Sequence, residues 1–300
     1  MISGYYNQIK NELLNNEVYK RVKDYSKNRN ELSTYYNVGK LLIEAGKQYG
    51  EKIIGNYSEK LVVEVVKKYN KRTLFRMRQF YKLIEEQKVS TVSTQLSWSH
   101  YCELLSIKDI DEINYYIITT ERYNLSVREL RERIKNKEYQ RLDDNTKLKL
   151  INKKELYISD TIKNPIIIKN KLEIDRENVS EKMLQKIILE DIEGFMRELG
   201  DSFSFIGSEY KIKINNAYNY IDLLLFNIKY NCYVVGELKV TEVKKEHIGQ
   251  IEVYMNYIDK HVKNITNDRT IGIIVARRDN HYYIEYSSDK RIYTRDYELV

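Results

Sequence analysis

Nearly continuous apolar runs in the second half of the chain constrain its fold most strongly. Strands that are apolar on both faces belong to a sheet that other elements cover on both sides. Three of the four strand candidates are such runs: YIDLLLFNI (220–228), CYVVGELKV (232–240) and TIGIIVARR (270–278), with FSFIGSEYKIKI (203–214) as the fourth. One long helix is expected over 178–200, before the strands, and another over 246–262, before the last strand. This order predicts an α/β or mixed α+β domain.

The first half of the chain instead has the period of helices. Apolar residues recur there at three-to-four spacing in one segment after another. We therefore expect an all-helical domain over residues 1–140. The chain then turns polar and contains its single proline, Pro165. This change predicts a linker over 141–165 and a second domain over 166–300.

A basic stretch stands out within the helical half. It holds six basic residues and no acid: Lys67, Lys68, Lys71, Arg72, Arg76 and Arg78. A helix, a tight turn and then a basic helix form the outline of a helix-turn-helix, whose second helix could lie in a DNA groove. The alternative is a solvated basic face. The formal charge of +7 permits a polyanionic partner without requiring one.

Several classes of protein are disfavoured by what the sequence lacks. Cys102 and Cys232 lie far apart with no CxxC pair, and the four histidines show no metal-ligand spacing, so a zinc cage is not expected. No run reaches the roughly 18 apolar residues of a membrane helix, and the first residues have no signal-peptide character. We expect a cytoplasmic protein with no membrane partner.

Three charged residues interrupt the apolar strands. Glu237 and Lys239 are two residues apart in one strand, so their side chains share a face of the sheet. Asp222 can reach the same end of the sheet if its strand pairs with theirs. Buried, unpaired charges are costly, and a divalent cation offsets the repulsion between two acids. Oxygen ligands of this kind suit Mg²⁺ or Mn²⁺. A metal ion held next to a lysine can catalyse phosphodiester hydrolysis. The alternative interpretation is a structural ion pair at the end of a strand, with no metal.

Two further groups of polar residues could join this site. Gln250 and Tyr254 lie four apart on one helical face and could orient water, lysine or phosphate. On the long helix, Glu190 borders the apolar stripe and could complete the acidic cluster. Asp191 and Glu198 project nearer the middle of that stripe, so the choice among these three acids stays open.

At these residues the chain resembles a known family. IDLLLF followed by GELK resembles the PD-(D/E)XK nuclease signature, and GQIEVY resembles the glutamine–tyrosine helix motif of some of its branches. The fuller pattern is similar to the YhcG family: FMRELGDSFSFIGSEY, CYVVGELKV and GQIEVYMNYID to its C-terminal domain, YYNVGKLL, LFRMRQFY, QLSWSHY and LSVRELRERI to its N-terminal domain. The resemblance covers most of the chain.

The resemblance implies a restriction-endonuclease-like core of mixed sheet, preceded by a winged-helix-like or related DNA-binding module. It also implies Asp222 and Glu237 as metal ligands, Lys239 as the catalytic lysine, and Glu190 as the helix acid of that superfamily. Two departures exist. No proline precedes the aspartate, and Ser208 and Glu209 stand where many relatives carry an arginine–glutamine pair. The second departure puts a substrate contact in doubt rather than catalysis.

The leading hypothesis is a Mg²⁺-dependent endonuclease that hydrolyses DNA phosphodiester bonds. The alternative is a catalytically weak or inactive nuclease-fold subunit of a restriction, defence or repair complex, and an RNA substrate is a further one. Double-strand cleavage by one site per chain favours a homodimer.

Overall fold

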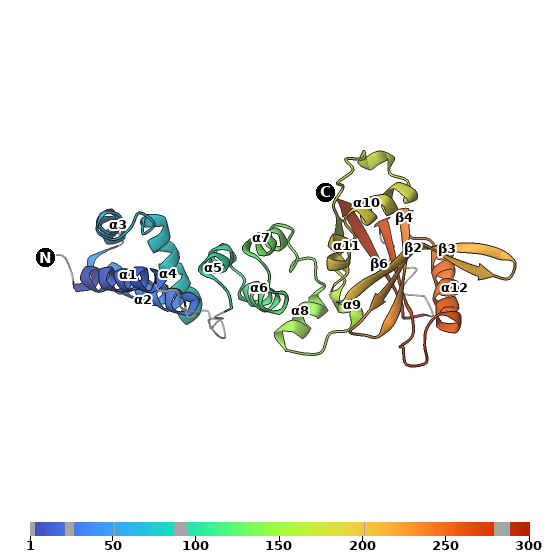
Figure 1. The fold of residues 1–300 in the computed structure, drawn as a ribbon, viewed down its shortest axis with the longest axis horizontal. Coiled ribbons are helices and arrows are strands. Elements are labelled where there is room, and N and C mark those ends of the chain that lie inside the picture. The colour runs from blue at the N-terminus through green and yellow to red at the C-terminus, as the bar shows by residue number, and fades with distance from the viewer. Residues whose placement is uncertain (1–3, 22–26, 51, 87–94, 201, 279–288) are drawn as a thin grey trace. The chain divides into compact units, whose positions relative to one another are not determined.

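The computed structural model describes residues 4–21, 27–50, 52–86, 95–200, 202–278 and 289–300. The chain divides into two compact units, Met1–Lys135 and Asn136–Val300, each of which is described by itself (Figure 1). Among the described helices, none is both long enough and apolar enough to cross a bilayer.

The described residues of the first unit form helices and contain no strand. They are α1 (Gly4–Arg21), α2 (Lys27–Tyr49), α3 (Ile53–Glu64), α4 (Lys71–Glu86), α5 (Trp98–Leu104), α6 (Ile110–Tyr123) and α7 (Val127–Lys135). The apolar face of α4 is buried at Leu74 and Met77. Gly39 of α2 lies against the Met77 carbonyl group, where a Cβ atom would clash, so the absence of a side chain lets α2 and α4 pack at backbone contact.

The second unit contains short helices and one sheet. Its elements are α8 (Asp144–Ile151), α9 (Ile158–Thr161), β1 (Ile166–Ile168), a 3₁₀ turn (Arg176–Asn178), α10 (Glu181–Glu190), α11 (Ile192–Leu199), β2 (Phe203–Ile214), β3 (Ala217–Asn227), β4 (Cys232–Glu242), α12 (Lys245–His261), β5 (Ile271–Arg278) and β6 (Ile292–Leu299). The strand order is β1-β6-β5-β4-β3-β2. β2, β3 and β4 pair antiparallel, whereas β4, β5, β6 and β1 pair parallel. The mixed α/β architecture expected from the sequence is confirmed.

Helices cover both faces of this sheet, as the apolar strands require (Figure 1). Val234 faces an apolar cluster that includes Leu184 and Ile188 of α10. Its neighbour Val235 faces the opposite cluster, with Ile251 and Met255 of α12. Successive residues of β4 therefore enter two different cores, which accounts for the unbroken apolar run.

Two details differ from the expected order of elements. The single helix expected over 178–200 is wrong, because the chain breaks at Asp191 between α10 and α11, where φ is −137° and ψ is 49°. β1 and β6 were not expected, because III is only three residues long and IYTRDYEL lacks the nearly continuous apolar run of the expected strands. Both strands lie at the parallel end of the sheet.

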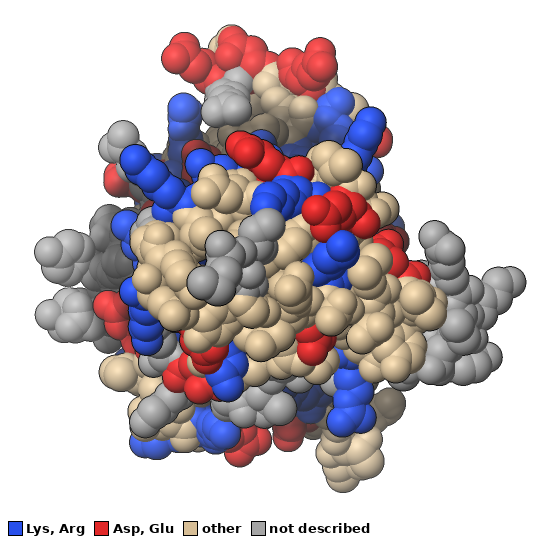
Figure 2. All heavy atoms as spheres, turned by 90° about the vertical axis from the view of Figure 1, so that its left-hand side faces the viewer, with Lys and Arg blue, Asp and Glu red and all other residues tan. Residues whose placement is uncertain are grey.

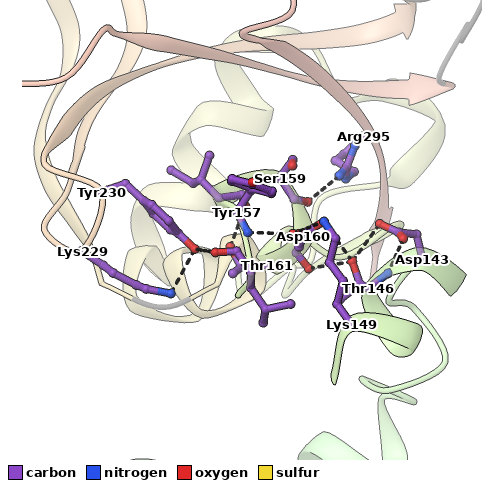
Figure 3. A network of polar contacts seen from close by, with 12 residues as sticks. Asp143, Thr146, Lys149, Tyr157, Ser159, Asp160, Thr161, Lys229, Tyr230 and Arg295 are labelled. Atoms are coloured by element: carbon purple, nitrogen blue, oxygen red, sulfur yellow. Dashed lines mark hydrogen bonds and ion pairs between the residues drawn. The ribbon is translucent and has the colours of Figure 1, made fainter. Parts of the chain in front are cut away.

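The range expected as a linker, 141–165, contains α8 and α9. Asp160 of α9 accepts hydrogen bonds from Lys149 Nζ at 2.7 and 2.8 Å and from the Tyr157 N–H at 2.7 Å (Figure 3). Arg295 of β6 donates to the Ser159 carbonyl oxygen at 3.0 Å and to the Ile162 carbonyl oxygen at 3.2 Å. These contacts fasten α9 to the sheet.

Candidate active site

Asp222 lies where the pairing between β3 and β4 stops. The last pair in the register is Leu223 with Gly236. One step further, Asp222 Oδ2 accepts the backbone N–H of Leu238 at 2.8 Å, so a side chain replaces the next rung of the ladder. This bond fixes the half-buried carboxylate between the two strands, beside the next residues of β4.

Glu237 and Lys239 project from the same face of β4, and their side chains meet. Lys239 Nζ lies 2.9 Å from Glu237 Oε1. The two residues are only 2% and 8% exposed. The structure therefore brings together the acid and the lysine of the motif in a setting that excludes most water, and Asp222 lies close enough to influence the charge of Glu237.

The pKa values of these groups record their surroundings. Burial, and then the neighbouring charge of Asp222, raises the pKa of Glu237 to about 7, although Lys239 opposes the shift. Burial also raises the pKa of Asp222, against the Leu238 hydrogen bond. Burial disfavours the charge on Lys239, but the combined attraction to Glu237, Glu181 and Asp222 outweighs it and leaves the lysine pKa above its usual value. Two acids lie close together here and one of them is deeply buried, so a nearby positive charge stabilises their ionised forms.

One oxygen of Glu237 lacks a partner. Of the buried side-chain oxygens in the described residues, Glu237 Oε2, Thr120 Oγ1 and Thr270 Oγ1 have no hydrogen-bond partner, and only the first belongs to a carboxylate. An unpartnered buried carboxylate oxygen is costly. Carboxylate oxygens suit Mg²⁺ or Mn²⁺, so Asp222 and Glu237 fit such an ion. The described residues contain no group of three or more His, Cys, Asp or Glu side chains arranged for a metal, so water or substrate would have to complete the ligand set.

Sequence reasoning missed Glu181. Ser180 caps α10, because its Oγ accepts the Met183 N–H at 3.3 Å. Glu181 therefore occupies the first helical position, and its Oε2 lies 3.3 Å from Lys239 Nζ. The capping serine was the available signal, since a cap fixes which acid begins the helix next to the sheet.

Glu190 was expected in the acidic cluster, and the structure does not bring it there. It is exposed at the far end of α10, nine residues or roughly 13 Å of helical rise from Glu181. The two alternatives are also engaged elsewhere. Asp191 pairs with Lys171 at 3.1 Å, and Glu198 accepts the Ile167 N–H at 3.1 Å. The geometry thus favours Glu181 as the helix acid of the cluster over Glu190, Asp191 and Glu198.

Gln250 and Tyr254 form the pair that their spacing suggested, on α12. Gln250 Nε2 donates to Tyr254 Oη at 3.1 Å. The tyrosine is buried in the same apolar cluster as Val235 and Ile221. Gln250, which is half-buried, is thereby held at the margin of the core. A further glutamine was missed: Gln185 Nε2 of α10 donates to the Asp222 carbonyl oxygen at 3.0 Å and ties that helix to β3.

The strand opposite Asp222 has an unusual backbone. Glu209 of β2 is exposed and has φ of 46°, a left-handed value that a non-glycine residue seldom adopts. The regular alternation of β3 slips beside it, since Ile221 and Leu224 both pack on the α12 side of the sheet. The charge of Glu209 contributes to the raised pKa of Asp222. The strained position therefore lies beside the acids.

The basic stretch begins in the turn between α3 and α4, which holds Lys67 and Lys68, and continues along α4. Lys68 Nζ lies 2.5 Å from Glu17 Oε1, so that lysine is neutralised within the unit. Arg78 stacks over the Phe75 ring, 4.7 Å from its centroid, and Lys71 lies 5.9 Å from the same centroid. Figure 2 looks onto the N-terminal helices, where lysine and arginine side chains are interspersed with acidic and uncharged ones. DNA binding by Lys67, Lys68, Lys71, Arg72, Arg76 and Arg78 stays a prediction.

Comparisons with known proteins agree with this arrangement. Residues 159–299 match the family described as the YhcG PDDEXK nuclease domain, and residues 14–141 match the DUF1016 N-terminal domain. The Escherichia coli (strain K12) protein named "Putative nuclease YhcG" is 25% identical over 286 residues, which cover 81% of this chain and 76% of that protein.

A solved structure, a repair endonuclease from Pyrococcus abyssi, aligns with a TM-score of 0.29 and 18% identity. The alignment covers 40% of this chain and 47% of that one, less than half of its length. The family matches divide the chain into a helical half and a half that carries Asp222, Glu237 and Lys239. The chain therefore carries a DUF1016 N-terminal domain followed by a YhcG PDDEXK nuclease domain.

Proposed function

We propose that this chain is a metal-dependent endonuclease that hydrolyses DNA phosphodiester bonds. Asp222 and Glu237 hold Mg²⁺ or Mn²⁺, and Lys239 assists catalysis. The observation that carries the proposal is Glu237 Oε2, a buried carboxylate oxygen with no partner, beside a second, half-buried acid, Asp222. The match to a nuclease family supports the same reaction class.

The metal would activate water and stabilise the charge that develops on the phosphoryl oxygens. Lys239 supplies a fixed positive charge next to the acids, because Glu237 and Glu181 hold its ammonium group from two sides. An ammonium in this setting stabilises charge more strongly than one in water, since little solvent screens it. Glu181 positions the lysine. Gln250 orients water or a phosphate oxygen at the edge of the core.

The helical unit binds DNA through the basic stretch that starts at Lys67. Lys67, Lys71, Arg72, Arg76 and Arg78 contact phosphates, whereas Lys68 contributes less because Glu17 neutralises it. Cleavage of both strands requires two sites, so we propose that the active form is a homodimer. Other subunits of a defence or repair system are compatible with this arrangement.

Nicking of supercoiled plasmid tests the proposal. The wild type is expected to nick in Mg²⁺ or Mn²⁺ and to stop in excess chelator, while Lys239→Ala binds DNA without nicking. Arg128→Ala, a basic side chain of α7 outside the site, serves as a matched control for purity and handling. Full activity of the wild type in chelator, or nicking by Lys239→Ala at the wild-type rate, contradicts the proposal.

A second candidate is an inactive DNA-binding subunit on the nuclease fold. One observation favours it: the described residues supply no third acid within a metal-ligand group. This candidate predicts DNA binding with no cleavage of duplex DNA, branched DNA or RNA in any divalent metal. Competition among those three nucleic acids for binding also separates a DNA substrate from an RNA substrate.

A further inference from the structure

The hairpin of β2 and β3 extends past the strand that carries Glu237 and Lys239. β4 pairs with β3 only from Leu223 to Asn227. The outer part of the hairpin, residues 210–221, continues as a two-stranded ribbon in which β3 pairs with β2 alone. In Figure 1 its turn projects beyond the rest of the sheet, past α12. The ribbon therefore starts at Asp222 and leads outward from the candidate active site.

One face of this ribbon is fixed to the protein. Ile212 and Ile221 are fully buried in the cluster that contains α12. The Lys213 N–H also donates to Tyr257 Oη at 3.5 Å. These contacts hold the ribbon in one orientation, so its other face is preorganised.

The opposite face presents two lysines and two tyrosines. The register places Lys211 opposite Tyr220 and Lys213 opposite Tyr218, and directly paired residues share a face. Tyr218 is 57% exposed and Tyr220 is 52% exposed. Lys211 Nζ lies 3.8 Å from the Tyr218 ring centroid and Lys213 Nζ lies 6.0 Å from it. The four side chains form one continuous surface, which we term the basic–aromatic face.

This surface has the chemistry of a single-strand binding platform. Ammonium groups pair with backbone phosphates, and exposed aromatic rings stack on bases whose faces are not covered by neighbours. Bases inside a duplex are already stacked, so rings of this kind distinguish unpaired nucleotides from paired ones. Tyr220 is two residues from Asp222, which is about 7 Å along a strand. The basic–aromatic face therefore begins close to Asp222.

We infer that the basic–aromatic face binds unpaired nucleotides next to the scissile phosphate, so that the protein prefers nucleic acid with a single-stranded segment over blunt duplex. This inference rests on the proposed function and names its substrate class. The lysines oppose the alternative occupant, a protein strand added to the open edge of β2, because charged side chains on an edge strand disfavour such pairing.

Fluorescence anisotropy in excess chelator tests the inference without cleavage. The probes are a labelled 20-nucleotide single strand and the blunt duplex of the same sequence. Tyr218→Ala with Tyr220→Ala is expected to weaken single-strand binding about thirtyfold or more and duplex binding less than twofold. Tyr218→Phe with Tyr220→Phe keeps both rings and should bind like wild type. Circular dichroism and thermal melting check the fold, which should be retained because both tyrosines are exposed.

The lysines are tested by salt dependence. Lys211→Ala with Lys213→Ala removes two phosphate contacts, so the slope of log affinity against log salt on the single strand should fall in magnitude by about 1.4. Lys211→Arg with Lys213→Arg should keep the wild-type slope. An unchanged slope in the alanine variant contradicts the assignment of these lysines.

Several results overturn the inference: no measurable affinity of the wild type for the single strand, wild-type affinity in the tyrosine-to-alanine variant, or equal losses on both probes. A phenylalanine variant as weak as the alanine variant also overturns it. The plasmid assay separates the two proposals. If wild type nicks plasmid but the tyrosine substitutions do not change single-strand binding, the inference about the basic–aromatic face is refuted and the nuclease proposal stands. If wild type never nicks plasmid but the tyrosines govern single-strand binding, the nuclease proposal is refuted and the inference about the face stands.

Discussion

Two buried acids of the second unit differ in how completely they are paired. Asp160 of α9, which is 6% exposed, uses both carboxylate oxygens: one bonds Lys149, and the other bonds Lys149 and the Tyr157 N–H. Glu237 of β4, which is 2% exposed, uses Oε1 for Lys239 and leaves Oε2 without a partner. Figure 3 shows Asp160 and its hydrogen-bond partners.

The difference separates a structural acid from one suited to a ligand. A closed network holds a buried charge in place and gains rigidity from it. A network that leaves a buried carboxylate oxygen without a partner destabilises the folded protein, and a bound cation can remove that destabilisation. We therefore expect changes at Asp160 to appear in stability, and changes at Glu237 to appear in cleavage and metal binding.

The largest expected effect is on cleavage. Glu237→Gln or Asp222→Asn removes a charged ligand of the proposed metal and should reduce plasmid nicking by about a thousandfold or more. The melting temperature of the metal-free protein should stay the same or rise, because either substitution removes an acid whose ionised form is disfavoured by burial. Nicking at the wild-type rate would show that the incomplete acid has no role in the chemistry.

Asp160→Ala should have the opposite profile. Lys149 and the Tyr157 N–H lose their partner, so the free energy of unfolding should fall by about 2–3 kcal/mol. Nicking measured well below the melting temperature should stay near wild type. Asp144→Ala is the control, since that aspartate pairs with Lys147 on the surface with its side chain 96% exposed and should cost at most about 0.5 kcal/mol.

The raised pKa of Glu237 predicts a pH dependence of stability. The folded protein keeps this proton up to about pH 7, whereas the unfolded chain releases it near its ordinary pKa of 4.5. Stability from this group is therefore present below about pH 4.5 and is lost as the pH rises to 7. Denaturation in chelator should show wild type losing on the order of 3 kcal/mol relative to Glu237→Gln over that interval. Parallel curves for the two proteins would contradict the raised pKa.

The smallest expected effect on nicking separates two acids of the same helix, α10. Glu181→Gln weakens the hold on the Lys239 ammonium and should slow nicking about tenfold, while Glu190→Gln at the exposed end of α10 should change nothing. Measuring nicking against pH distinguishes positioning from a structural role, since the loss of a neighbouring acid lowers the pKa of Lys239 and shifts the alkaline limb. Equal rates in both variants would remove Glu181 from the site.

Much of this arrangement followed from local sequence. Glu237 and Lys239 meet because residues two apart share a strand face, and β2 to β5 coincide with the expected strands. Gln250 and Tyr254 meet because four residues make about one helical turn. Such contacts within one element depend only on its period.

Contacts between elements could not be predicted in the same way. Glu181 reaches Lys239 because of how α10 is placed on the sheet, which depends on the break at Asp191 and on the core packing of Leu184 and Ile188. The Leu238 N–H that fixes Asp222 is free only because the β3–β4 ladder ends there. Neither the break nor the end of the ladder has a local sequence signal.

The most direct test of the account is a crystal structure of the protein with Mn²⁺, analysed by anomalous scattering. The account predicts one peak at about 2.1 Å from a carboxylate oxygen of Asp222 and from Glu237 Oε2, with Lys239 still beside the acids. The peak should be absent from Glu237→Gln crystals grown in the same solution. A manganese ion bound elsewhere, or an unchanged Glu237–Lys239 pair with no ion at saturating metal, would contradict it.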